Sequence, residues 1–208
     1  MSTQRKWSVL LIGGPSGVGK TTVARQIGLR YGVPWLQVDD LRLALIRSGM
    51  TLPNGNAALT FFQDKHAWQL SPEQFCDGLI ALGNVLSPAI EVVIENHVDT
   101  HAPLVIEGDA LLPALFARPS VQVRADNGSV QAIFLIEPEE DVILANIIAR
   151  GRSANEYTEA ELRTEAHAKW LYGQWLANEA HRYGLPVVEA RPWSTLVERI
   201  MTMVDIEK

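Results

Sequence analysis

The sequence has little of what marks disulfide-stabilised, membrane-spanning or nucleic-acid-coating proteins. Its single cysteine, Cys76, excludes an internal disulfide and a Cys-rich metal site, and a small buried apolar group is the better interpretation. No apolar run approaches the roughly 18 to 20 residues of a membrane helix. Lys and Arg number 18 against 24 Asp and Glu, and the net charge of −6 argues against nucleic-acid binding by bulk charge. We therefore expect a cytoplasmic protein with neither a membrane nor a nucleic acid as partner.

The composition is that of one globular domain. The chain has 208 residues, of which 47% are hydrophobic and 20% charged. It shows no internal repeat, low-complexity segment or linker, so residues 1–208 are treated as a single unit.

Short apolar runs alternate with segments of helical spacing. The expected strands are residues 8–12, 34–38, 104–106, 130–136 and 187–188. The expected helices are residues 20–31, 39–47, 71–96, 138–150, 159–183 and 195–204. Such alternation predicts an α/β protein whose parallel sheet has helices on both faces. Residues 49–100 are expected to form a helical excursion over the active site, and Asp126-Asn127-Gly128 a hairpin or tight turn.

One motif in the sequence predicts phosphate binding. Residues 14–21, Gly-Pro-Ser-Gly-Val-Gly-Lys-Thr, match the phosphate-binding pattern G-x-x-x-x-G-K-[ST] between a predicted strand and a predicted helix. Its glycines let successive N–H groups converge on phosphate oxygens, beside the positive end of the helix. Lys20 is expected at the β- and γ-phosphates and Thr21 on Mg²⁺. The candidate nucleotide-binding residues are Gly14, Pro15, Ser16, Gly17, Val18, Gly19, Lys20, Thr21 and Thr22, the last without an assigned role.

A P-loop alone does not separate kinases from GTPases or ATPases. The chain lacks the Asn-Lys-x-Asp motif with which GTPases read the base. The Asp-ended strand of larger ATPases is matched only weakly, by residues 105–109.

Three segments resemble the small P-loop kinases, a group that includes nucleoside-monophosphate, shikimate and gluconate kinases. These segments are residues 13–22, residues 38–42 (Val-Asp-Asp-Leu-Arg) and residues 104–108 (Leu-Val-Ile-Glu-Gly). The sequence is similar in particular to 2-phosphoglycerate kinase-like proteins, and the likeness covers about half of the chain. It implies a three-layer P-loop NTPase fold with a five-stranded parallel sheet. It also implies an ATP- and Mg²⁺-dependent phosphotransferase that acts on a hydroxyl or phosphate of a small anionic metabolite resembling 2-phosphoglycerate.

The resemblance also suggests where the acceptor binds. Asp39 or Asp40 would accept the proton of the acceptor hydroxyl or orient its oxygen, although either could instead cap the helix. Arg42, one turn further on, would hold a negative charge of the acceptor with its guanidinium group.

The end of the third predicted strand should face the same site, because ligands of open parallel sheets bind beyond the carboxyl ends of strands. Gly108 would let the acceptor approach the backbone. Asp109 or Glu107 would hold Mg²⁺ through water, although Asp109 could instead cap the next helix.

Two further groups of residues are candidates. Arg150 and Arg152 resemble the entry to a lid, over about residues 150–160, that closes on the transferred phosphate, although a cation also suits a helix C-terminus. Arg191, in the loop after the last strand, would contact adenine, with Trp193 as an alternative or as core filler. The acidic run of Glu137, Glu139, Glu140 and Asp141 is interpreted as a solvated helix start.

An ATP–Mg²⁺-dependent phosphotransferase is thus the leading hypothesis. A nucleotide or nucleoside kinase is the alternative within enzymes. Two further hypotheses stay open: a nucleotide-gated regulator that contacts a protein partner, and a kinase fold that has lost turnover. The sequence does not indicate the oligomeric state.

Overall fold

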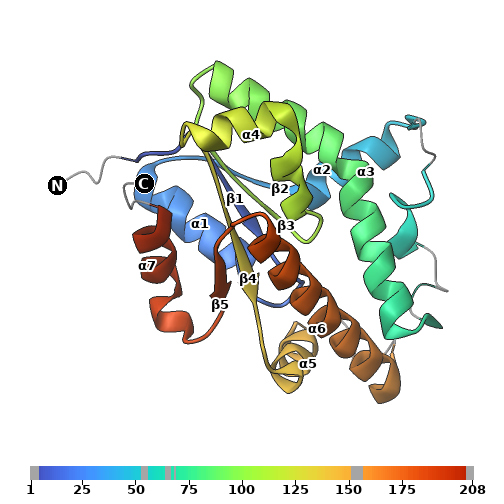
Figure 1. Ribbon diagram of the computed structural model, residues 1–208. Helices are drawn as coiled ribbons and strands as arrows, with labels where there is room; N and C mark the ends of the chain where they lie inside the picture. The colour runs from blue at the N-terminus through green and yellow to red at the C-terminus, as the bar shows by residue number, and fades with distance from the viewer. Residues whose placement is uncertain (1–4, 53–55, 64–66, 68, 151–156, 205–208) are drawn as a thin grey trace.

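Five parallel strands form one sheet at the centre of the protein (Figure 1). The structure is a computed structural model that describes residues 5–52, 56–63, 67, 69–150 and 157–204. Its strand order is β2-β3-β1-β4-β5, and every neighbouring pair is parallel. The strands are β1 (Val9–Gly13), β2 (Trp35–Gln37), β3 (Leu104–Gly108), β4 (Val130–Ile136) and β5 (Val187–Glu189). The predicted α/β class with a five-stranded parallel sheet is confirmed.

Helices cover both faces of the sheet, which explains why the strands are almost continuously apolar. On one face α1 (Lys20–Tyr31) and α7 (Trp193–Val204) pack against Leu10 and Ile12 of β1. On the other face α3 (Pro72–Asp99), α4 (Pro119–Asp126) and α6 (Glu159–Arg182) pack against Val9 and Leu11. The remaining α-helices of the described residues are α2 (Val38–Arg47), which follows β2, and α5 (Glu140–Ala149), which contacts α6.

Helix α3 begins as predicted, at a reciprocal cap. The Gln74 N–H donates to Ser71 Oγ (3.3 Å), and the Ser71 N–H donates to Gln74 Oε1 (3.1 Å). The helix continues through Pro88 to Asp99. By length and composition alone this helix could cross a membrane, contrary to the expectation that no segment is long and apolar enough, but a buried core helix passes the same test. Its residues Leu79, Leu82, Leu86, Ile90 and Ile94 lie in the core of this domain.

The segment before β4 differs from the expectation. Residues 113–126, for which no helix was predicted, form a short 3-10 helix, η3 (Pro113–Ala117), and α4. Each begins with a proline, which suits the first position of a helix. Of the two expected alternatives at residues 126–128, a hairpin or a tight turn, the tight turn is confirmed and the hairpin is wrong, because the turn joins helix α4 to strand β4. Asn127 Oδ1 accepts the Ser129 N–H (3.0 Å) in this turn.

We expect Leu86→Ala to destabilise the protein by about 2–5 kcal/mol, because Leu86 is fully buried between α3 and the sheet. Val92→Ala is the matched control on the same helix, since Val92 is 61% exposed, and should change stability by less than about 0.5 kcal/mol. Urea unfolding measures both. Equal effects of the two substitutions would contradict the packing described for α3.

Candidate active site

The predicted P-loop lies between β1 and α1, where the backbone conformation requires glycine. Gly14 has a φ of 140° and Gly19 a φ of 85°, both in the region that other residues rarely adopt. A Cβ on Gly14 would stand 2.3 Å from the Leu135 carbonyl oxygen, and one on Gly19 would stand 2.2 Å from the Trp193 ring. The loop can therefore keep this path close to β4 and α7 only without side chains at these two positions.

The lysine and threonine of the loop contact the two acidic residues at the end of β3. Lys20 Nζ donates to the Pro15 carbonyl oxygen (2.9 Å) and to Asp109 Oδ1 (2.5 Å). Thr21 Oγ1 donates to Glu107 Oε1 (2.7 Å). The contacts arise because β1 and β3 are parallel neighbours, which brings their carboxyl ends to the same edge. The structure thus brings Lys20, Thr21, Glu107 and Asp109 together.

Glu107 is almost fully buried, and this changes its acid–base behaviour. Burial raises the pKa of its carboxyl group, whereas the Thr21 hydrogen bond and the charge of Lys20 act in the opposite direction. A cation bound beside Glu107 would favour its charged form.

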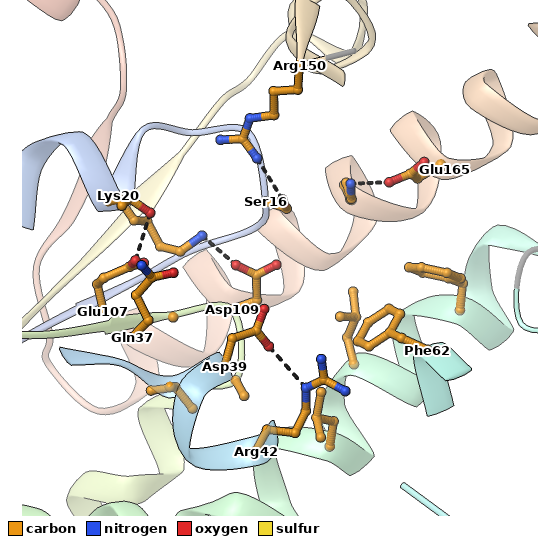
Figure 2. A pocket seen from close by; sticks show the side chains of 18 of the residues that line it. Ser16, Lys20, Gln37, Asp39, Arg42, Phe62, Glu107, Asp109, Arg150 and Glu165 are labelled. Atoms are coloured by element: carbon orange, nitrogen blue, oxygen red, sulfur yellow. Dashed lines mark hydrogen bonds and ion pairs between the residues drawn. The ribbon is translucent and has the colours of Figure 1, made fainter. Parts of the chain in front are cut away.

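A cavity of about 470 Å³ opens beyond these residues (Figure 2). Its walls come from the P-loop, the ends of β2 and β3, and helices α2, α3 and α6. The lining residues are Ser16, Lys20, Thr21, Gln37, Val38, Asp39, Arg42, Phe62, Phe75, Leu79, Leu82, Glu107, Gly108, Asp109, Ala110, Arg150, Tyr157, Glu165 and Lys169. One end of the cavity is therefore formed by the P-loop, and the other end is lined by both apolar and charged side chains of α2, α3 and α6.

Helix α2 presents Asp39 and Arg42 to this cavity. Arg42 Nε donates to Asp39 Oδ1 (3.0 Å), and its guanidinium group lies over the Phe62 ring, 5.8 Å from the ring centre. Asp40 is exposed and is not among the cavity-lining residues. The N-cap of α2 is Gln37, so the expectation that one of the two aspartates caps this helix is wrong.

Arg150 also reaches the P-loop. It ends α5, and its Nη1 donates to Ser16 Oγ (3.1 Å), so the side chain stands over the loop rather than only at a helix C-terminus. Arg152 and most of the proposed lid, residues 151–156, lie outside the described residues.

Arg191 forms ion pairs with two acidic residues that follow β4. Its Nε and Nη2 donate to the two oxygens of Glu137 (2.9 Å each), and Nη2 also lies 2.7 Å from Glu139 Oε1. Glu137 is buried, so the expected solvated helix start is wrong for this residue. Trp193 is 44% exposed, which excludes a role as core filler, and it lines a cleft of about 260 Å³ with Gly19 and Thr22.

Two charged residues of the cavity wall were missed from the sequence. Glu165 and Lys169 form a buried ion pair on α6, and both line the cavity. A charged pair four residues apart on a helix is typical of a solvated face. The available signal was that both lie on the apolar side of α6, near Leu162, Ala166 and Tyr172.

Comparison with known proteins agrees with this geometry. No protein-family model matches the chain. It is 26% identical to 2-phosphoglycerate kinase of Methanocaldococcus jannaschii over 98% of this chain and 67% of that protein. It is 24% identical to 2-phosphoglycerate kinase of Methanococcus maripaludis over 94% of this chain and 64% of that protein. The chain thus spans about two thirds of the length of these relatives.

A solved structure, shikimate kinase from Acinetobacter baumannii in complex with shikimate, superposes with a TM-score of 0.50 and 14% identity. The superposition covers 95% of this chain and 93% of that one, and it shows the same fold. The chain is a small P-loop kinase. Such a kinase uses a nucleotide, a divalent metal and a small-molecule acceptor.

The oxygen atoms beside the P-loop of this kinase fit a divalent metal such as magnesium. Thr21 supplies a hydroxyl and Glu107 a carboxylate, both hard oxygen ligands, with Asp109 nearby. Within the described residues, no cluster of three or more His, Cys, Asp or Glu side chains could enclose a metal. Mg²⁺ at a nucleotide site is held by one or two protein groups together with phosphates and water.

We expect Glu107→Gln to stabilise the nucleotide-free kinase increasingly as the pH rises. The unfolded carboxyl group ionises near pH 4.5, whereas the folded one, with its raised pKa, keeps its proton to higher pH. Wild type therefore loses stability between these two values, by about 1.4 kcal/mol per unit of pKa difference, and the glutamine variant does not.

Calorimetric melting between pH 4 and pH 8 measures this difference. The melting temperature of the variant minus that of wild type should grow through the window and then level off. A difference in melting temperature that stays flat or shrinks with rising pH would contradict a raised pKa of Glu107 in the folded protein.

Proposed function

We propose that the kinase transfers the γ-phosphoryl group of MgATP to the hydroxyl of a small anionic acceptor of the 2-phosphoglycerate type. The observation that supports this is one continuous cavity, lined at one end by Lys20 and Thr21 and at the other by Asp39 and Arg42. Both curated relatives are named 2-phosphoglycerate kinase, and we infer the type of acceptor from that name.

The triphosphate would lie on the N–H groups of the P-loop, at the N-terminus of α1. Lys20 would exchange its bond to Asp109 for one to the β- and γ-phosphates. Arg150, already on Ser16, would stand over the γ-phosphate and stabilise the charge that spreads onto its oxygens. The base would lie towards the cleft that Trp193 and Thr22 line, on the side of the loop away from the acceptor.

Thr21 and Glu107 would hold Mg²⁺, the second directly or through water. When bound, the ion neutralises charge on the β- and γ-phosphate oxygens. Asp109, released by Lys20, would remain close enough to bind a water of that ion or the acceptor.

The acceptor would lie between α2 and α6. Arg42, whose planar guanidinium group suits carboxylate and phosphate, would hold an anionic group. Asp39 would accept the proton as the acceptor oxygen bonds to the γ-phosphorus and the bond to the bridging oxygen of ADP breaks. Because the proposed reaction consumes ATP, we continue to predict that the protein acts in the cytoplasm.

Acceptor-dependent ADP release tests the proposal. With MgATP, 2-phosphoglycerate should raise ADP release by the purified chain well above the rate without acceptor. Lys20→Met should abolish both this release and tight MgATP binding, because the phosphates lose their only buried cation in the described part of the loop. ADP release that no hydroxyl acceptor accelerates would contradict a phosphotransferase and favour a nucleotide-gated regulator.

Asp39→Asn should lower kcat by about 10²- to 10⁴-fold, because the amide cannot accept the acceptor proton. Its oxygen can still accept the Arg42 hydrogen bond, so acceptor KM should change little. MgATP affinity should stay within about twofold of wild type, since Asp39 is not on the P-loop.

Asp40→Asn is the matched control, since Asp40 is adjacent, exposed and outside the cavity lining. It should leave kcat within about twofold of wild type. Unchanged transfer by Asp39→Asn, or equal losses in both variants, would overturn the role given to Asp39.

A further inference from the structure

Helix α6 carries a charged pair on its buried side. Glu165 and Lys169 are 7% and 6% exposed, and the Lys169 ammonium donates to the Glu165 carboxylate. The buried residues around them on the helix are apolar or small, such as Leu162, Ala166 and Ala168. The pair therefore interrupts a face that otherwise packs as core.

Stability does not explain this pair. Removing two charges from water costs several kcal/mol per ion before their attraction is counted, and packed hydrophobic residues in their place are often as stable or more so. Both side chains also line the cavity of the proposed active site. The pair thus has access to a ligand.

The cationic side chains that line the cavity can be assigned to two ligands, the triphosphate of the nucleotide and the acceptor. Among the described lining residues, four are cationic: Lys20, Arg42, Arg150 and Lys169. Lys20 and Arg150 contact the P-loop and would be used by the triphosphate. Arg42 and Lys169 lie on separate helices, α2 and α6, and are left for the acceptor. Figure 2 shows Arg42 and Glu165, the ion-pair partner of Lys169, at different sides of the cavity.

Each of these two cations is held by a carboxylate of its own helix. Arg42 bonds to Asp39, and Lys169 bonds to Glu165. The carboxylates balance the cations without ligand and keep them aimed at the cavity. Apolar side chains of Phe62, Phe75 and Leu79 also line the cavity, which suits a short carbon chain between two charged groups.

Resting on the proposed function, we propose that Lys169 is a specificity-determining residue that binds a second anionic group of the acceptor. The acceptor is then a small hydroxy compound with two separate anionic groups, one on Arg42 and one on Lys169. Glu165 acts as a positioning residue, which holds the ammonium in place before the acceptor arrives and shares it afterwards.

Three acceptors with a primary hydroxyl test this proposal: 2-phosphoglycerate, glycerate, which lacks the phosphate, and glycerol 2-phosphate, which lacks the carboxylate. Wild type should use 2-phosphoglycerate with a kcat/KM at least tenfold above either analogue. Lys169→Met should raise the KM for 2-phosphoglycerate at least tenfold and leave the KM for ATP within about twofold. The analogue that lacks the group read by Lys169 should be insensitive to the substitution.

A variant that keeps the interior neutral guards against misfolding. Lys169→Met alone leaves the buried Glu165 without the ammonium, so Glu165→Gln/Lys169→Met is made beside it and should give the same pattern. Glu165→Gln alone keeps the cation but removes its carboxylate partner. It should raise the KM for 2-phosphoglycerate by less than Lys169→Met does and should keep the preference for 2-phosphoglycerate over the two analogues. Lys169→Arg should restore part of the preference.

Equal losses for all three acceptors in the Lys169 variants would overturn the proposal and leave a structural role for the pair. Lack of discrimination among the three acceptors by wild type would overturn it as well. Failure of the underlying function would look different, because no acceptor would then stimulate ADP release even by wild type.

Discussion

The ammonium group of Lys20, held between the Pro15 carbonyl and the Asp109 carboxylate, is the interaction on which the rest of the site depends. It ties the loop after β1 to the end of β3. Tyr172 of α6 donates to the Asp109 carbonyl oxygen (2.5 Å), so the same residue also connects this edge of the sheet to the helix that forms the far wall of the cavity. A charge this buried needs a partner at all times, and a triphosphate can replace the carboxylate as that partner.

The other cations that line the cavity are also paired in the absence of ligand. Lys20, Arg42 and Lys169 each pair with a carboxylate of the chain, and Arg150 bonds to a hydroxyl. Such a site is close to neutral when empty, so no large patch of unbalanced buried charge opposes folding. Anionic ligands then gain from cations that are already oriented, which lowers the entropic cost of binding.

Sequence and structure agree best where chemistry is local. The spacing of residues 14–21, with a strand before and a helix after, predicted the P-loop, whereas the bonds of Lys20 to Asp109 and of Thr21 to Glu107 are seen only in the structure. Asp39 and Asp40 could not be separated, because their difference is a rotation of about 100° around a helix whose start was one residue uncertain. Glu165 and Lys169 stayed hidden because only the fold brings α6 over the carboxyl edge of the sheet. Glu137 was misinterpreted because its partner, Arg191, lies 54 residues away in the sequence.

A crystal structure with Mg²⁺ and a non-hydrolysable ATP analogue tests the central claim most directly. The account predicts the phosphates on the N–H groups of residues 14–21, with Lys20 Nζ moved from Asp109 onto the β- and γ-phosphate oxygens. It also predicts the metal against Thr21, on the Glu107 side. An analogue bound elsewhere, with the Lys20–Asp109 ion pair intact, would contradict it.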